Sequence, residues 1–138
     1  MKDYFFNYKV CLDDLDYMGI VGNSQWMIFL ERSRIDLLEK VNFPFSEMKK
    51  QQIGGVVAEA NIKFLKPAFF DDKIEIKILP HSPFSKGFIL NYKIKNQHNC
   101  ECLSAEIIII FVDSSGKSIR IPENIREKFF KDEQGVVS

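Results

Sequence analysis

The sequence predicts an α+β fold in which an antiparallel sheet of about five strands curves around one long helix. Two observations carry this prediction. One segment near the N-terminus has the periodicity of a long helix, and most of the remaining chain alternates apolar and polar residues between short turns. Short connections favour antiparallel neighbours, and a helix with a wide apolar surface needs a sheet to cover it.

The predicted central helix begins near Asn23 and Ser24, which are both good N-cap residues. Residues 26–30 (WMIFL) are apolar all round, so we expect this half of the helix to be buried on more than one side. A helix that runs on to Lys40 is about 25 Å long at 1.5 Å per residue. Pro44 then ends the helical region, because proline disfavours the α conformation in the residue before it.

The predicted strands come one before the helix and four after it. Prolines at 80 and 83 are expected to bracket a loop, and Pro122 opens a C-terminal helix. In the second strand, Ala58, Ala60, Ile62 and Phe64 are expected to share one face. The predicted ranges are strands at 3–10, 56–65, 73–79, 88–95 and 101–113, a short helical turn at 46–52, and a helix at 123–131.

Composition limits the class of protein. At 138 residues the chain is expected to be one domain over residues 1–131, followed by a frayed tail at 132–138. The counts of Lys+Arg and Asp+Glu are both 19, so the basic excess that is usual in nucleic-acid-binding proteins is absent. We expect no signal peptide, no membrane-spanning segment, reduced cysteines and a cytoplasmic location.

The acidic segment before the helix offers the clearest chemistry. Asp14 and Asp16 lie just upstream of Gly19, Gly22 and the predicted helix start. Backbone N–H groups and the helix dipole favour negative charge there, including the charge that develops on a carbonyl oxygen during acyl transfer. A carboxylate beside such donors can act as a nucleophile or as a general base on water. The alternative is that these aspartates only satisfy N–H groups of a turn.

Other reactive residues have a weaker pattern. His81 and His98 lie in predicted turns far apart in the sequence, which is typical of solvated histidines. Cys100 and Cys102 would share one strand face, an arrangement that makes a poor disulfide and half a metal site at best. We therefore expect no metal site and no cofactor.

The segment DLDYMGIVGNSQW (14–26) resembles the D-x-D-x-x-G-x-V-x-[NH]-x-x-Y signature of hotdog-fold thioesterases, the 4-hydroxybenzoyl-CoA and YbgC-like acyl-CoA thioesterases. FLERSR (29–34) is similar to the family's F-x-E-x-x-R helix. VAEANIKFLKPA (57–68), followed by DKI (72–74), resembles its long second strand and the segment after it. The resemblance covers residues 4–113 and implies a hotdog fold.

The resemblance also implies roles for individual residues. Asp16 matches the family's catalytic carboxylate, and the backbone N–H at Asn23 would polarise the thioester carbonyl. Trp26 replaces the usual Tyr, which keeps an aromatic wall in the acyl pocket, while the large residues at 17 and 18 would narrow the entrance. The residues expected to bind substrate are Tyr17, Met18, Gly19, Trp26 and Met27.

Several charged residues receive a structural interpretation. Glu31 is expected to pair with Arg34 three residues later, and Glu59 to form a structural hydrogen bond or salt bridge. The remaining candidates are Asp13 and Asp14, which would shape the loop, and Lys63, Lys66, Lys86 and Arg120, which could meet the phosphates of coenzyme A.

The function implied by the resemblance is hydrolysis of an acyl- or aroyl-CoA to free acid and CoA. The carrier could also be acyl carrier protein. The alternative is a non-catalytic hotdog module that binds acyl groups or a protein partner. A hotdog dehydratase or hydratase is disfavoured, because the histidine that those enzymes need is not at the required position. The family's site lies between two subunits, so we expect a homodimer or homotetramer.

Overall fold

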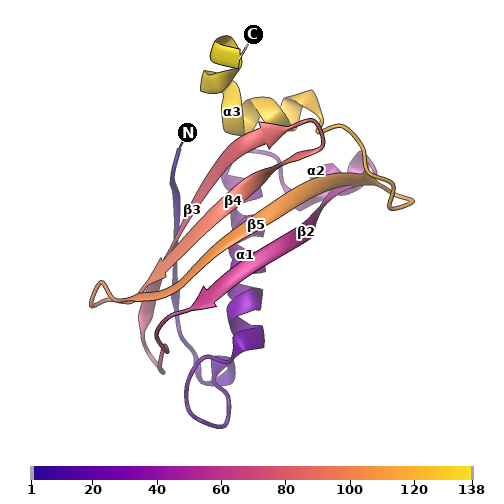
Figure 1. Ribbon diagram of the computed structural model, residues 1–138. Helices are drawn as coiled ribbons and strands as arrows, with labels where there is room; N and C mark the ends of the chain where they lie inside the picture. Colours follow the sequence, from indigo (N-terminus) through magenta and orange to yellow (C-terminus); the bar gives the residue numbers. More distant parts are fainter. Residues whose placement is uncertain (1, 138) are drawn as a thin grey trace.

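A long helix and a curved sheet form the two layers of the computed structural model, which describes residues 2–137, with side chains described through Phe130 (Figure 1). The sheet has five strands in the order β1-β3-β4-β5-β2, and every neighbouring pair is antiparallel. The elements are β1 Tyr4–Lys9, the 3₁₀ turn η1 Leu12–Asp14, α1 Asn23–Lys40, α2 Phe45–Lys50, β2 Ile53–Phe64, β3 Lys73–Phe84, β4 Gly87–Lys95, β5 Glu101–Asp113 and α3 Glu123–Val137.

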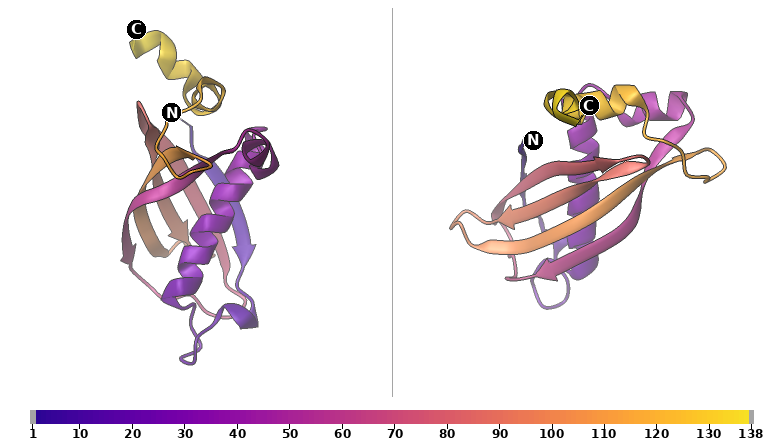
Figure 2. Two further views of the ribbon diagram at one scale, coloured as in Figure 1. Left: turned by 90° about the vertical axis from the view of Figure 1, so that its right-hand side faces the viewer. Right: turned by 45° about the horizontal axis from the view of Figure 1, so that its top comes forward.

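α1 lies across one face of the sheet, and the acidic loop before it lies at the opposite end of the molecule from α3 (Figure 2). The helix buries the side chains that its periodicity places on one face, which confirms the predicted helix. Beyond the end of α1, Phe129 and Phe130 of α3 pack on Phe88 with ring centroids 5.2 and 5.6 Å apart. The buried residues of α1 are Trp26, Phe29, Leu30, Ser33 and Leu37.

Two residues of the all-apolar segment of α1 are not buried. Met27 is 53% exposed and Ile28 is 46% exposed, so the prediction that residues 26–30 are buried on more than one side is wrong for the single chain. The reason is geometric: the sheet covers one face of α1, whereas Met27 and Ile28 lie on its flank beside β2, the edge strand.

Several predicted boundaries also need correction. β3 continues past Pro80 to Phe84, where a loop is predicted. The proline is tolerated because β1 stops pairing at Ile78, so beyond that point one side of β3 is an open edge that requires no N–H donor. α2 begins one residue before its predicted range, and β2 begins at Ile53 rather than at 56.

A bulge in β2 changes the predicted face of that strand. The pairing with β5 shifts between Val57 and Glu59, which leaves Ala58 as the extra residue. Val57, rather than Ala58, therefore shares the inner face with Ala60 and Ile62, because all three pair with inward-facing residues of β5.

α3 continues to Val137, past the predicted end at 131, with non-helical backbone angles at Phe130. The frayed tail is predicted at 132–138. Its side chains and residue 138 lie outside the described part of the chain. Among the described residues, no helix is long and apolar enough to cross a membrane. The cysteines Cys11, Cys100 and Cys102 are all free, as predicted.

Two tyrosine hydroxyls anchor α1 to the sheet. Tyr8 of β1 donates a hydrogen bond to Asp36, and Nη1 of Arg34 lies 3.4 Å from the hydroxyl oxygen of Tyr92. Burial raises the pKa of Tyr92 to about 12, although the nearby Arg34 guanidinium acts in the opposite direction. Burial and the contact with Asp36 raise the pKa of Tyr8 as well.

We expect the free energy of unfolding to fall as the pH rises from 10 to about 12. In this range an unfolded tyrosine loses its proton, whereas Tyr92 in the folded protein keeps it. The unfolded state then binds fewer protons than the folded state. Alkaline pH therefore favours the unfolded state and lowers the free energy of unfolding. For Tyr92 the effect reaches roughly 2–3 kcal/mol at 1.36 kcal/mol per pKa unit. Urea unfolding of wild type and Tyr92→Phe across this range measures it, and the Phe variant should decline less steeply.

Tyr17→Phe is the matched control for this measurement. The Tyr17 side chain is 95% exposed, so its hydroxyl is solvated in both states and its removal should leave the slope unchanged. Equal slopes for wild type and Tyr92→Phe would show that Tyr92 does not contribute to alkaline unfolding.

Candidate active site

The acidic loop is a compact turn that is tied to the rest of the fold. The N–H of Asp16 donates to the carbonyl of Ile20 at 2.8 Å, and the N–H of Gly19 donates to the carbonyl of Asp16 at 3.0 Å. Gly19 has a φ of +77°, which lies in the left-handed region that favours glycine. The N–H of Val21 donates to the carbonyl of Ala68 at 2.9 Å, which anchors the loop to the segment between β2 and β3.

Asp16 lies in this turn beside the start of α1. Its Oδ1 accepts the N–H of Met18 at 2.8 Å. A methyl group placed on Gly22 would lie 3.6 Å from Cβ of Asp16 and 3.9 Å from its Oδ2, so the carboxylate packs against the residue that precedes the helix. Because Oδ1 is held by the loop and the side chain is exposed, Oδ2 is available to react with a ligand or with water.

The first turn of α1 leaves its backbone N–H groups without a side-chain cap. Gly22 is the N-cap residue and has no side chain, so the prediction that Asn23 or Ser24 caps the helix is wrong. Asn23 is instead the first helical residue. The N–H groups of residues 23–25 point out of an 18-residue helix, whose dipole places partial positive charge at this end. The Asp16 carboxylate therefore lies next to a group of donors suited to an oxyanion.

Asp14 holds the loop from behind and is only 9% exposed. Its Oδ2 accepts the N–H of Cys11 at 2.7 Å, and its Oδ1 accepts Nε2 of Gln25 at 2.8 Å. The prediction that Asp14 shapes the loop is confirmed. Sequence reasoning missed Gln25, although a glutamine at the third position of a helix is a known signal for a contact back to the preceding segment.

We expect Asp14→Ala to destabilise the fold by about 1–3 kcal/mol, because it leaves two part-buried donors without acceptors. Urea unfolding measures the change. Asp13→Ala removes an exposed carboxylate from the same 3₁₀ turn and should cost less than 0.5 kcal/mol. Equal losses in the two variants would contradict a structural role for the Asp14 hydrogen bonds.

A groove runs along α1 on the side that faces β2. It consists of two adjoining cavities of about 250 and 370 Å³, both of which are lined by Glu31, Arg34 and Val57. We call it the α1–β2 groove. Its walls are Met27, Ile28, Leu30, Glu31, Arg34, Ile35, Leu37 and Leu38 of α1, Gly54, Gly55, Val56, Val57, Ala60 and Ile62 of β2, Phe88 and Leu90 of β4, Ile107, Ile109 and Phe111 of β5, Phe45 and Met48 of α2, and Phe129 of α3.

A sequence model of the thioesterase-like superfamily matches residues 10–129 of this chain, which includes the acidic loop, α1 and the whole groove. The chain belongs to this superfamily. The acyl-CoA thioester hydrolase YbgC of Escherichia coli O6:H1 is 25% identical over 122 residues, which cover 88% of this chain and 91% of YbgC.

Solved structures share the fold of this chain. A protein from Aquifex aeolicus superposes with a TM-score of 0.86 at 24% identity, covering 91% of this chain and 98% of that one. A 1,4-dihydroxy-2-naphthoyl-CoA thioesterase from Synechocystis also gives 0.86, at 15% identity, covering 93% of this chain and 96% of that one. The predicted hotdog fold is confirmed. The superfamily match and the similarity to YbgC group this chain with thioester hydrolases.

The predicted substrate-binding residues divide into three groups. Tyr17 and Met18 lie at the exposed end of the loop, 95% and 68% exposed, beside Gly19. Met27 lines the α1–β2 groove. Trp26 is 3% exposed and packs edge-on against Phe29 in the core, with ring centroids 5.8 Å apart. Its predicted role as a wall of the acyl pocket stays a prediction.

Two charged residues, Glu31 and Glu59, differ from their predicted roles. In the part of the chain whose side chains are described, Glu31 and Arg34 form no ion pair, and Arg34 contacts Tyr92 instead. The Glu59 side chain is exposed and forms no hydrogen bond or salt bridge with another described side chain. Nζ of Lys86 donates to Oγ of Ser118 at 2.9 Å. Contacts of Lys63, Lys66, Lys86 and Arg120 with coenzyme A remain predictions.

Proposed function

We propose that this superfamily member hydrolyses acyl-CoA thioesters to free acid and CoA, with Asp16 as the catalytic carboxylate. The observation that carries the proposal is the position of Asp16 Oδ2 against Gly22, beside the uncapped amides of α1. The name of YbgC, an acyl-CoA thioester hydrolase, supports the substrate class.

In the proposed reaction the thioester carbonyl oxygen accepts hydrogen bonds from the first-turn amides, including the N–H of Asn23. Asp16 Oδ2 then either attacks the carbonyl carbon or removes a proton from an attacking water. Negative charge that develops on the carbonyl oxygen is stabilised by these amides and by the helix dipole. In the general-base route, collapse of the tetrahedral species expels the CoA thiolate and gives the free acid, and the proton that Asp16 took from water passes to the thiolate. In the nucleophilic route, collapse expels the thiolate and leaves an anhydride between the acyl group and Asp16, which a water molecule then hydrolyses to the free acid and the Asp16 carboxylate. No step needs a metal or another cofactor, and we place the reaction in the cytoplasm.

The test is thiol release from a panel of short, long and aromatic acyl-CoAs, together with acyl carrier protein thioesters of matching acyl groups. Turnover on the CoA series supports the proposal and identifies the acyl class. Turnover on the acyl carrier protein thioesters alone would show that the carrier is acyl carrier protein and not CoA. Absence of turnover on every thioester would favour the alternative, a module that binds acyl groups without hydrolysing them.

We also propose that two copies associate through β2. This edge strand is twelve residues long and exposes Val56, Val57 and Phe64 by 40–46%, which is typical of an edge that pairs with another chain. Analytical ultracentrifugation distinguishes a dimer from a tetramer. A monomer at all accessible concentrations would contradict the proposal.

A further inference from the structure

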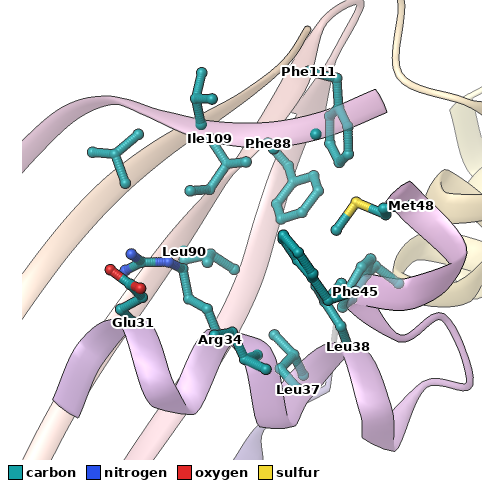
Figure 3. A pocket seen from close by; sticks show the side chains of 16 residues that line it. Glu31, Arg34, Leu37, Leu38, Phe45, Met48, Phe88, Leu90, Ile109 and Phe111 are labelled. Carbon is teal, nitrogen blue, oxygen red and sulfur yellow. The ribbon is translucent and has the colours of Figure 1, made fainter. Parts of the chain in front are cut away.

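The described lining of the α1–β2 groove is apolar except at the one place where Glu31 and Arg34 lie. Figure 3 shows the half nearer α2, with Leu37 and Leu38 of α1 on one side, Phe88, Ile109 and Phe111 of the sheet on another, and Phe45 and Met48 of α2 at the end. Among the lining residues that the structure describes, Glu31 and Arg34 alone are charged.

These two charged side chains lie where the two cavities meet. The end groups of Glu31 and Arg34 point into the same region of the groove (Figure 3). Nη1 of Arg34 contacts the hydroxyl of Tyr92, which holds the guanidinium toward the sheet. The carbon stem of Arg34 can then cover apolar surface while its charged end keeps a polar partner. Beyond this point toward α2, the described lining side chains offer no hydrogen-bonding group to a ligand.

The groove starts close to the proposed reaction centre and ends at α2. Met27 at its near end is one helical turn after Asn23, whose N–H is the proposed oxyanion donor. From Met27 to Leu38 the helix advances about 16 Å at 1.5 Å per residue. An extended hydrocarbon chain that advances roughly 1.3 Å per carbon, as expected for C–C bonds of ~1.5 Å, would place about a dozen carbons in this length.

We propose that the α1–β2 groove binds the acyl chain of the substrate as a straight aliphatic chain, whose length limit is set by Phe45 and Met48 of α2. The inference rests on the proposed thioesterase function and adds its acyl class. A single-ring aromatic acyl group fits less well, because Arg34 lies seven residues, or about 10 Å along the helix, beyond Met27. The ring would end before Arg34 and leave the apolar walls toward α2 unfilled. The long apolar groove instead matches a flexible hydrocarbon chain.

The direct test is binding of non-hydrolysable S-alkyl thioethers of CoA, measured by isothermal titration calorimetry. This readout does not depend on turnover. We expect Kd to fall from butyl through octyl to dodecyl, by roughly two- to fourfold for each methylene that is buried, and then to level off at hexadecyl. A Kd that does not change with the length of the alkyl group would overturn the proposal. The same result is expected if a second copy of the protein, rather than the alkyl group, fills the groove.

Two substitutions test the position of the chain. Gly55 faces the groove, since a methyl group there would lie 3.2 Å from Cγ2 of Ile109 and 3.7 Å from the ring of Phe111. Gly55→Val should therefore weaken dodecyl-CoA binding at least tenfold and leave butyl-CoA binding almost unchanged. Phe45→Ala opens the far end of the groove, and it should tighten hexadecyl-CoA binding at least fivefold.

The Phe45 variant also guards against a folding defect, because Phe45 is 58% exposed and its loss should not unfold the protein. Phe5→Ala is its matched control: Phe5 is 44% exposed on β1, at the opposite edge of the sheet, and should not change any Kd. If both groove variants bind the alkyl series as wild type does, the alkyl group binds elsewhere and the proposal is wrong. Length-dependent binding without thiol release would support the groove and contradict the proposed hydrolysis.

Discussion

Asp16→Asn is expected to lower kcat/KM for thioester hydrolysis by at least about 10²-fold, within the range of 10²–10⁴ that is typical of a general base. Asparagine is nearly isosteric, and its side-chain oxygen can still accept the N–H of Met18, so the turn should remain intact. The loss should therefore appear in kcat, with little change in the binding of alkyl-CoA thioethers. Thiol-release kinetics and urea unfolding of the same preparation separate chemistry from stability.

Asp13→Asn is the control for this experiment. It makes the same change of charge in the same loop, at an exposed residue, and should keep turnover within about twofold of wild type. If Asp16→Asn retained wild-type turnover, Asp16 would not be the catalytic carboxylate. If both variants lost activity equally, the effect would come from the net charge of the loop.

Gly87→Ala is expected to prevent stable folding. A methyl group at Gly87 would lie 1.8 Å from the carbonyl oxygen of Ile109 and 3.0 Å from Cα of Ile110, which are backbone atoms of β5. Relief of this overlap requires β4 and β5 to separate where they pair, at the interior of the sheet. The expected loss exceeds about 4 kcal/mol, which is a large part of the 5–15 kcal/mol that stabilises a typical domain. Soluble yield and urea unfolding measure it.

Gly54→Ala is the comparison for this variant. Gly54 also lies in a strand, but no atom of the rest of the fold comes within 4 Å of the added methyl group. Its unfolding midpoint should equal or slightly exceed that of wild type, because alanine restricts the unfolded chain. A Gly87→Ala variant with a wild-type midpoint would be incompatible with the backbone approach of β4 to β5.

Elements with a clear period were predicted well. The strict alternation at 73–79 and the helical pattern that ends at Lys40 both correspond to observed elements, because burial on one face requires that spacing. Predictions that relied on a single residue were less successful. Asn23 and Ser24 are strong N-cap residues, yet Gly22 is the N-cap. Pro80 suggested the end of a strand, yet β3 continues through it at an open edge.

The bulge at Ala58 gives the same lesson for the site. Simple alternation along β2 assigns Ala58 to the inner face, but the extra residue shifts Val57 to that face and so into the α1–β2 groove. The position of a bulge depends on pairing with β5, which is more than forty residues away in sequence. Local propensity therefore could not predict this wall of the groove.

The sequence by itself determined the fold class, the family resemblance and the candidate carboxylate, because periodicity and a short motif are local properties of the chain. Only the tertiary structure placed Asp16 against Gly22, gave Asp14 its contact with Gln25, and aligned α1, α2 and β2 into a groove. These features depend on contacts between segments distant in the sequence, and packing of the helix on the sheet decides which side chains meet.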